Sequence, residues 1–292
     1  MQYLPKGKLI AVGGNENKGS LYLPGMPEVD HAGFLEFGIL KRILREVIAA
    51  GGRLEIITTA SEIPREVGSN YVQAFGKLDY QNVGLMHIRN RKDASNPEYL
   101  QRIKSAGGVL FSGGDQLRLT AAFSDTRFRE ILLKRYREEQ FVIAGTSAGA
   151  MAMSEVMVAR GEIKGYLTKG GVKLAAGLAF APPLIIDTHF VNRGRFGRLV
   201  EVVASHPDCL GIGLGEDTGM VITEGNRIEI IGSGAVMLVD GSAVGHSNVP
   251  LAENGQPLSV ENLKVHVLTR GNGYLVGEKK FLPAVYTATA RR

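Results

Sequence analysis

Cysteine and tryptophan are almost absent from this chain of 292 residues, which contains one cysteine and no tryptophan. The single thiol, Cys209, excludes a disulfide within the chain and is compatible with a reducing compartment. Long runs of lysine or arginine are also absent, and 34 basic against 29 acidic residues give a net charge of only +5. Nucleic-acid binding is therefore a minor hypothesis, and substrates that carry carboxylates fit the charge equally well.

The sequence also lacks long hydrophobic segments. The uncharged stretch 174–186 is too short to span a bilayer and contains two prolines. Residues 1–7 do not have the apolar core of a secretory signal. A hydrophobic content of 44% and a charged content of 22% are typical of a soluble globular protein. We therefore expect a cytoplasmic protein with no membrane partner.

Short β-branched runs alternate with longer amphipathic segments through the first half of the chain. This pattern predicts an α/β fold with a mostly parallel central sheet covered by helices. The strands are expected at residues 8–12, 54–58, 83–88, 109–112 and 141–144. The helices are expected at residues 33–50, 64–75, 97–104 and 116–137, the last of them broken near residues 124–125.

The second half of the chain continues this pattern and then changes. Strands are expected at residues 184–186, 210–214 and 219–222, with a helix at 195–204. From about residue 225 to 292, short alternating runs separated by Gly and Asn predict antiparallel strands. Because no linker or repeat is present, we expect a single domain over residues 1–292 with a β-rich C-terminal extension.

The segment Gly145-Thr146-Ser147-Ala148-Gly149 has the most informative pattern. It follows a predicted buried strand and leads into a predicted helix, so Ser147 can stand on a strained turn with an exposed Oγ, a nucleophile elbow. The N–H of Ala148 suits an oxyanion, and the N–H of Gly114, in a turn after another strand, would complete the pair. A plain small-residue turn fits the same pattern, so other residues must decide.

A serine nucleophile needs a general base and a group that orients this base. Of six histidines, His189 is the best candidate, because it follows an apolar run at the expected carboxyl end of a central strand. Glu216 follows another short strand and would share that edge, with Asp217 and Asp187 as alternatives. The order Ser147, His189, Glu216 places the acid last, whereas α/β-hydrolases have the order serine, acid, histidine.

Three arginines follow His189 within ten residues: Arg193, Arg195 and Arg198. Because arginine binds carboxylates through paired N–H donors, they are candidates to hold anionic groups of a substrate. The alternative is a solvated helix start that pairs with Glu201. The turn 13–17, after the first predicted strand, is a further candidate to line the same edge of the sheet.

These motifs together resemble those of the cyanophycinases, serine peptidases related to the aspartyl dipeptidases. The motifs are, in chain order, residues 113–116, 145–150, 187–190 with the arginines that follow, and 215–218. The resemblance implies a three-layer α/β sandwich similar to class I glutamine amidotransferases. It also implies a homodimer that needs no metal or organic cofactor.

The family's substrate is cyanophycin, a poly-aspartate backbone with arginine on each side-chain carboxyl. The implied activity is exopeptidase hydrolysis to β-aspartyl-arginine dipeptides through an acyl-enzyme. Ser147 would be the nucleophile, His189 the base and then the acid, and Glu216 the group that orients His189. The residues implied to bind substrate are Gln116, Asp187, Thr188, Arg193, Arg195 and Arg198. In this set the arginines would meet carboxylates and Asp187 would meet substrate arginines, while Thr188 stands where the family has glutamine.

Two alternatives stay open. An α-aspartyl dipeptidase, or another peptidase for acidic peptides, would share the nucleophile, base and acid, although the three arginines favour cyanophycin. A non-catalytic binding protein on an amidotransferase-like scaffold is the alternative of another class. A covalent adduct between Ser147 and a serine-directed probe would argue against it.

Overall fold

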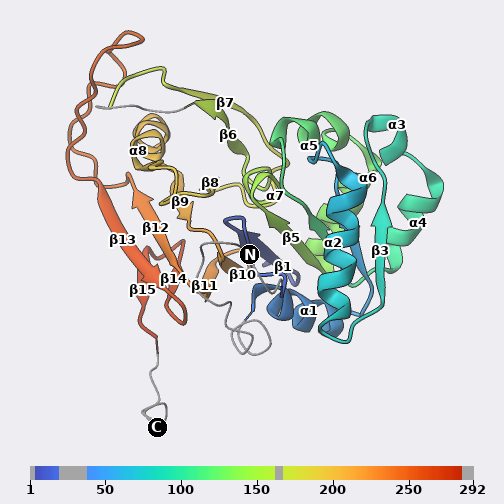
Figure 1. Cartoon of the computed structure of the whole chain (residues 1–292). Coiled ribbons are helices and arrows are strands. Elements are labelled where there is room, and N and C mark those ends of the chain that lie inside the picture. The colour runs from blue at the N-terminus through green and yellow to red at the C-terminus, as the bar shows by residue number, and fades with distance from the viewer. Residues whose placement is uncertain (1–3, 20–37, 162–166, 285–292) are drawn as a thin grey trace.

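The computed structural model describes residues 4–19, 38–161 and 167–284 (Figure 1). In these ranges the helices are α1 (Ile39–Ala49), α2 (Pro64–Gly76), α3 (Arg91–Ala94), α4 (Pro97–Ser105), α5 (Gln116–Phe123), α6 (Arg127–Glu138), α7 (Ala148–Met151) and α8 (Phe196–Ser205). The strands are β1 (Lys8–Val12), β2 (Leu54–Ile57), β3 (Val83–Met86), β4 (Gly108–Phe111), β5 (Val142–Thr146), β6 (Val156–Gly161), β7 (Val172–Ala176), β8 (Leu184–Asp187), β9 (Leu210–Leu214), β10 (Thr218–Thr223), β11 (Arg227–Gly232), β12 (Ala235–Asp240), β13 (Lys264–Thr269), β14 (Gly273–Leu275) and β15 (Lys280–Leu282).

A large sheet of nine strands forms the centre of the fold, in the order β15-β14-β11-β10-β1-β5-β4-β2-β3. The strands from β1 to β3 in this order are mutually parallel. The others join antiparallel, starting with β10 beside β1. The prediction of a mixed α/β fold with a large central sheet is therefore confirmed. The prediction that this sheet is mostly parallel is wrong, because four of its strand pairs are parallel and four are antiparallel.

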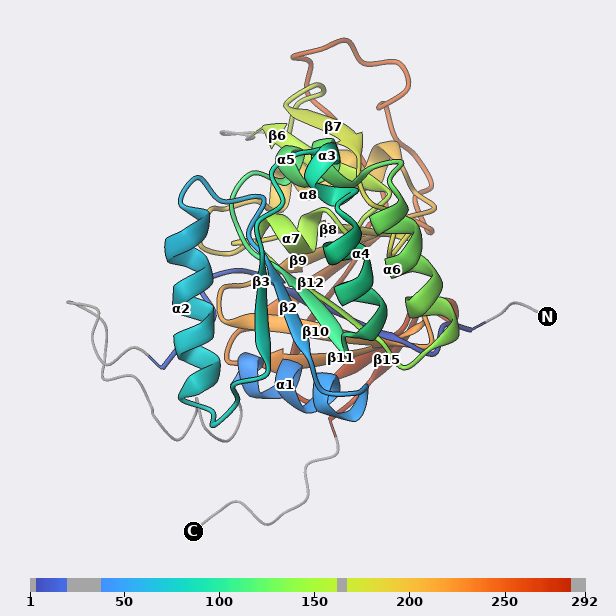
Figure 2. The same cartoon turned by 90° about the vertical axis from the view of Figure 1, so that its right-hand side faces the viewer.

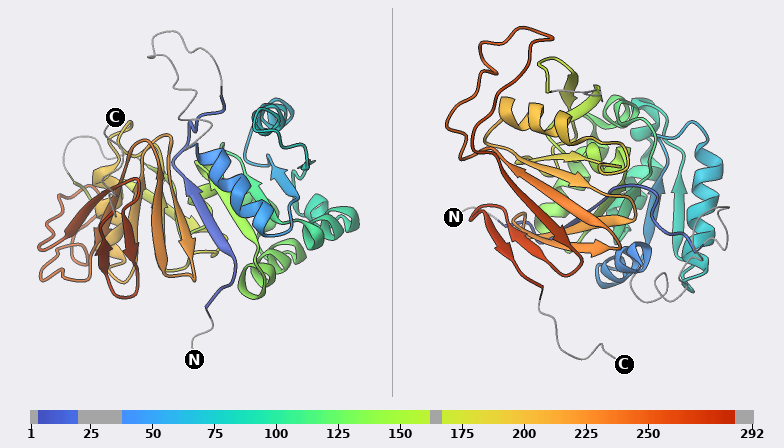
Figure 3. Two further views of the ribbon diagram at one scale, coloured as in Figure 1. Left: turned by 90° about the horizontal axis from the view of Figure 1, so that it is seen from below. Right: turned by 60° about the vertical axis from the view of Figure 1, so that its left-hand side comes forward.

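A second sheet contains four strands in the order β13-β12-β9-β8. Only β8 and β9 run parallel in it, so both strands end at the same edge, as predicted. However, β8 is an edge strand of this second sheet. The expectation that His189 follows a central strand is therefore wrong. The C-terminal strands lie on the opposite side of β1 from the helix-covered half of the large sheet (Figure 3).

Helices cover both faces of the parallel half of the large sheet (Figure 2). Alternate residues of β1, β4 and β5 pack against α1 and α2 on one face and against α4 to α7 on the other. Burial on two faces explains why β2, β4 and β5 contain no exposed residue and are largely apolar. The one charged residue in them, Glu55 of β2, forms ion pairs with Arg53 and Arg102. Each large aliphatic side chain buried in this way contributes about 1.5–3 kcal/mol of transfer free energy.

Helix boundaries follow local signals. The predicted break between α5 and α6 is present, because Asp125 has a positive φ of 54° and the Thr126 hydroxyl accepts a hydrogen bond from the N–H of Arg129 at 3.3 Å. The first predicted helix begins at Ile39, while residues 33–37 of that prediction lie outside the described residues. No helix within the described ranges has both the length and the apolar composition that a membrane crossing requires.

Candidate active site

Ser147 stands on a sharp turn between a buried strand and a short helix. β5 ends one residue before it and α7 begins one residue after it, and its own φ and ψ are 50° and −112°. A positive φ is strained for a residue with a Cβ, so surrounding contacts must hold this conformation. One of them is the hydrogen bond from the Ser147 N–H to the carbonyl oxygen of Val12 in β1, at 2.9 Å.

The glycines on either side of Ser147 allow the helix to approach the sheet. A Cβ on Gly145 would lie 2.5 Å from the carbonyl oxygen of Gly149, and a Cβ on Gly149 would overlap the carbonyl oxygen of Phe111 in β4. Both obstacles are backbone atoms, which cannot move aside as a side chain can. The spacing of glycines around Ser147 is therefore a steric requirement of this turn.

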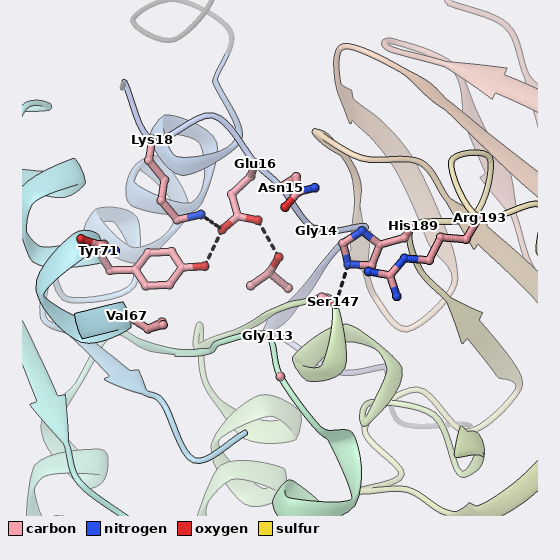
Figure 4. Close-up of a pocket in the computed structure, with 13 residues that line it drawn as sticks. Gly14, Asn15, Glu16, Lys18, Val67, Tyr71, Gly113, Ser147, His189 and Arg193 are labelled. Atoms are coloured by element: carbon pink, nitrogen blue, oxygen red, sulfur yellow. Dashed lines mark hydrogen bonds and ion pairs between the residues drawn. The ribbon is translucent and has the colours of Figure 1, made fainter. Parts of the chain in front are cut away.

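Ser147, His189 and Glu216 form a continuous chain of contacts (Figure 4 shows the first of them). Ser147 Oγ lies 2.8 Å from His189 Nε2, and His189 Nδ1 lies 2.6 Å from Glu216 Oε1. Because an ionised carboxylate can only accept, the proton of the neutral imidazole belongs on Nδ1, which leaves Nε2 to accept from the serine hydroxyl. This is the geometry that activates a serine nucleophile.

The turn after β1 joins the two sheets beneath this chain of contacts. The carbonyl oxygen of Gly13 accepts the N–H of His189 at 2.9 Å, and that of Gly14 accepts the N–H of Asp217 at 2.9 Å. A Cβ on Gly14 would overlap the imidazole of His189, and a Cβ on Gly13 would overlap the carbonyl oxygen of Gly215. The two glycines thus let residues of the second sheet reach the serine of the first.

The environment of Glu216 favours its charged form. Burial raises the pKa of this carboxyl. Hydrogen bonds with His189 and Asn15, together with electrostatic attraction to His189 and Arg193, lower it by more, so the net pKa lies below the ordinary value. A carboxylate that stays ionised at neutral pH can hold the imidazole in one orientation. It can also balance the charge that His189 acquires when it takes a proton.

A cavity of about 460 Å³ opens beside Ser147 and His189. Gly113 and Gly114 form part of its wall, and a Cβ on Gly113 would lie 3.3 Å from the Cβ of Ser147. Gly114 has a φ of 140° and packs against the backbone of residues 60–61. Within the described residues, the N–H groups of Gly114 and Ala148 have no hydrogen-bond acceptor. Both amides are therefore free to bind an oxyanion.

The three arginines have different environments. Arg193 is exposed and lines the cavity. Arg195 Nη1 lies 3.3 Å from Asp187 Oδ1. Arg198 is buried and donates to both carboxylate oxygens of Asp187, with Nε 2.5 Å from Oδ2. Asp187 has no exposed surface, and its carboxylate forms ion pairs with Arg195 and Arg198. This arrangement differs from the expectation that Asp187 meets arginines of the substrate. The ion pairs of the described residues include none between Arg198 and Glu201.

The remaining predicted substrate residues also contact the protein itself. Gln116 Nε2 donates to the carbonyl oxygens of Val158 and Ala159 in β6, at 2.9 and 2.8 Å. Thr188 is buried, and its N–H donates to Asp187 Oδ1 at 2.8 Å. The structure therefore brings Arg193 to the cavity and places the other five in the surrounding framework. Their contact with substrate stays a prediction.

The cavity wall also contains four residues that the sequence did not single out, Lys18, Val67, Asn70 and Tyr71, beside Glu16 from the turn 13–17. The carboxylate of Glu16 is buried and accepts hydrogen bonds from the hydroxyl of Tyr71 and from Thr146 Oγ1, the latter at 2.6 Å, while Lys18 Nζ lies 2.8 Å away. Burial raises the pKa of Glu16, but Lys18 and the hydrogen bonds lower it more, so the net pKa falls. The turn 13–17 was the available signal for Glu16. Tyr71, from α2, had none.

The described ranges contain no group of three or more His, Cys, Asp and Glu side chains arranged to hold a metal ion.

The chain is similar to known peptidases in sequence and in fold. The model of peptidase family S51 matches residues 36–231. The chain is 37% identical over 248 residues to a cyanophycinase of Trichormus variabilis (strain ATCC 29413 / PCC 7937). This match covers 85% of this chain and 83% of that protein. It is 35% identical over 228 residues to a cyanophycinase of Geminocystis herdmanii (strain PCC 6308), over 77% of this chain and 84% of that protein.

One solved structure supports the fold. A peptidase from an acI-B1 Actinobacterium superposes with a TM-score of 0.65 at 22% identity, and the match covers 94% of this chain and 98% of that one. The family match spans well over half of the chain and includes Ser147, His189 and Glu216. With the agreement of motif, fold and sequence, the chain belongs to peptidase family S51.

Proposed function

We propose that this protein is a cyanophycinase, a serine-type exopeptidase that releases β-aspartyl-arginine dipeptides from cyanophycin. The observation that carries the proposal is the contact chain from Ser147 Oγ through His189 to Glu216 at the wall of the cavity. Relatives named as cyanophycinases, 32–37% identical over most of the chain, support the substrate.

In the proposed mechanism, the turn at Ser147 acts as a nucleophile elbow. His189 Nε2 takes the proton of the serine hydroxyl as Oγ attacks the carbonyl carbon of the scissile bond. The N–H groups of Gly114 and Ala148 bind the oxyanion that forms, and Glu216 stabilises the imidazolium. His189 then gives its proton to the leaving amine. Water, activated by the same imidazole, hydrolyses the acyl-enzyme and restores the serine.

The chemistry of the substrate refines the role of the arginines. Arginine is joined to the backbone through its amino group, so each branch carries a free α-carboxylate and a guanidinium. We assign the carboxylate to Arg193, which is exposed at the cavity wall. Gln116, Asp187, Thr188, Arg195 and Arg198 would act mainly by holding the wall and the loop that carries Arg193.

We extend the proposal to the whole molecule. The layered sheet and helices are proposed to form a single peptidase domain over residues 1–292, similar to the class I glutamine amidotransferase sandwich. The assembly is proposed to be a homodimer in the cytoplasm. Sedimentation of the purified protein tests the dimer, since a monomer at micromolar concentration would contradict it.

Incubation with purified cyanophycin and mass analysis of the products tests the function. We expect β-aspartyl-arginine from the wild-type protein and none from Ser147→Ala, with the same melting temperature for both. Activity retained in Ser147→Ala would overturn the mechanism. An intact polymer together with cleavage of α-aspartyl dipeptides would favour the dipeptidase alternative. A covalent adduct at Ser147 with a serine-directed probe separates both enzymes from a non-catalytic binding protein.

A further inference from the structure

The active-site cavity has a second cationic wall that the proposed mechanism does not use. Lys18 lines the cavity together with Ser147 and Arg193. Figure 4 shows Lys18 and Arg193 on opposite sides of the serine. The side chain of Lys18 is 29% exposed, so its ammonium is accessible and partly desolvated. A substrate bound over Ser147 therefore passes between two positive charges.

Neighbouring groups hold Lys18 in place. Its Nζ lies 2.8 Å from Glu16 Oε1 and 4.9 Å from the centre of the Tyr71 ring. These contacts restrict a long side chain that would otherwise lose considerable rotamer entropy when it binds a ligand. Lys18 is thus oriented before substrate arrives.

Glu16 serves as an internal anchor. Its Oε1 faces the hydroxyl of Tyr71 and the ammonium of Lys18, and its Oε2 accepts from Thr146. The side chain is only 2% exposed. Its charge is therefore already satisfied, and it is a poor partner for a guanidinium of the substrate.

The ammonium of Lys18 keeps donors for a ligand. It carries three N–H groups, and Glu16 is its one hydrogen-bonding partner among the described residues. The other carboxylate near the serine, Glu216, is occupied by His189. The free charges around the serine thus favour a carboxylate over a cation.

We propose that Lys18 binds the α-carboxylate of an arginyl branch of the substrate and is a specificity-determining residue of this site. The inference rests on the proposed cyanophycinase function and adds a second carboxylate subsite, across Ser147 from Arg193. The site recognises the carboxylate end of the branch, and the guanidinium extends away from Lys18.

Steady-state kinetics on a matched pair of substrates test this subsite. The first is a short β-aspartyl-arginine oligomer with free branch carboxylates, and the second is the same oligomer with α-carboxamides. We expect Lys18→Met to raise KM for the carboxylate substrate roughly tenfold or more, since a hydrogen bond between charged groups is lost. We expect kcat to stay within about twofold and KM for the amide to be unchanged.

Two variants serve as controls. Lys18→Arg keeps the charge and should recover most of the affinity for the carboxylate substrate. Lys104→Met makes the same chemical change at an exposed position of α4 and should alter neither substrate. Lys18→Met could unfold because Glu16 loses its counter-charge. In that case the double variant Glu16→Gln with Lys18→Met, which removes both charges, takes the place of Lys18→Met in the kinetic test.

Three outcomes would overturn the proposal. These are unchanged kinetics in Lys18→Met, an equal rise in KM for both substrates, or a fall in kcat alone, which would mean that Lys18 acts on Ser147 through Glu16 and Thr146. The wild-type reaction reports the proposed function separately. If the wild-type protein leaves the oligomer intact, the proposed function fails. If the wild-type protein cleaves the oligomer but Lys18→Met loses no affinity specifically for the carboxylate substrate, only this inference fails.

Discussion

At the scale of single residues, the site depends on backbone conformations that few side chains adopt. Ser147, His189 and Asp217 have φ values of 50°, 49° and 45°. Such conformations cost of order 1–3 kcal/mol each and persist where surrounding contacts enforce them. Here the contacts come from β1 and the turn after it, which bond to the backbone of all three. These strained turns therefore fix Ser147 Oγ and the imidazole of His189 against each other, and Asp217 fixes the turn that carries Glu216 beside them.

The sequence predicted these side chains better than it predicted the arginines. Ser147, His189 and Glu216 each follow a strand, and neighbouring strands bring such positions to one edge. Helical spacing, in contrast, says which face of a helix an arginine occupies but not what covers that face. Arg198 is only 4% exposed because β8 supplies Asp187 as its partner.

Exchange of single arginines separates a structural from a substrate role. Arg198→Met leaves Asp187 buried without its main counter-charge, so we expect the free energy of unfolding to fall by about 3–5 kcal/mol. Arg193→Met changes an exposed side chain, so we expect stability to change by no more than about 0.5 kcal/mol while KM for cyanophycin rises. Chemical denaturation and steady-state kinetics measure the two effects. If Arg198→Met kept full stability but lost substrate affinity, the result would favour direct binding of substrate by Asp187 and Arg198, as expected from the sequence.

At the scale of elements, the function is concentrated at strand ends. The turns after β1, β4 and β5 of the large sheet meet those after β8 and β9 of the second sheet. Strands buried on both faces were predicted within about two residues, because their apolar runs are short and bounded by turn residues. The sequence indicated the hairpin of β6 and β7 and the short strand β14 less clearly, because these strands mix exposed and buried residues without a clear period.

The turn between β5 and α7 provides a test at this scale. Gly149→Ala would place a methyl group against the Phe111 carbonyl, so we expect a loss of about 1–3 kcal/mol or more in stability. Displacement of Ser147 by about 1 Å should lower kcat/KM roughly 100-fold. Gly76→Ala, at the end of α2, meets no atom within 4 Å and serves as the matched control. It should be at least as stable as the wild type, since alanine favours a helix by about 1 kcal/mol. Equal activity of both variants would contradict the steric argument.

At the scale of the whole molecule, two sheets share one catalytic edge. The serine belongs to the large sheet, while the histidine and glutamate follow strands of the second sheet. Strands β10 and β11 continue the large sheet and β12 continues the second, so the C-terminal part completes both. Tyr274 in β14 is fully buried in the hydrophobic core that includes residues of both sheets.

Removal of this side chain should affect stability without affecting chemistry. We expect Tyr274→Ala to lower the free energy of unfolding by about 3–5 kcal/mol, as for other large aromatic residues in cores. The kcat of the folded protein should be unchanged, since Tyr274 does not line the cavity of the active site. Tyr274→Phe keeps the volume and removes a hydroxyl that has no hydrogen-bond partner in the described structure, so it should remain as stable as the wild type. A fall in kcat in Tyr274→Ala at temperatures where it is folded would show that the C-terminal strands influence the site.

The sequence by itself determined the order of most elements, the turn at Ser147 and the identity of the three residues in contact. These features are local, since they depend on the spacing of apolar residues and on where glycine interrupts it. Only the tertiary structure decided that β8 lies at the edge of a second sheet, that Asp187 is enclosed by arginines, and that Lys18 faces the cavity across from Arg193. Such features depend on contacts between distant segments, as between Tyr71 and Glu16, 55 residues apart. No spacing in the chain encodes which of these segments will pack together.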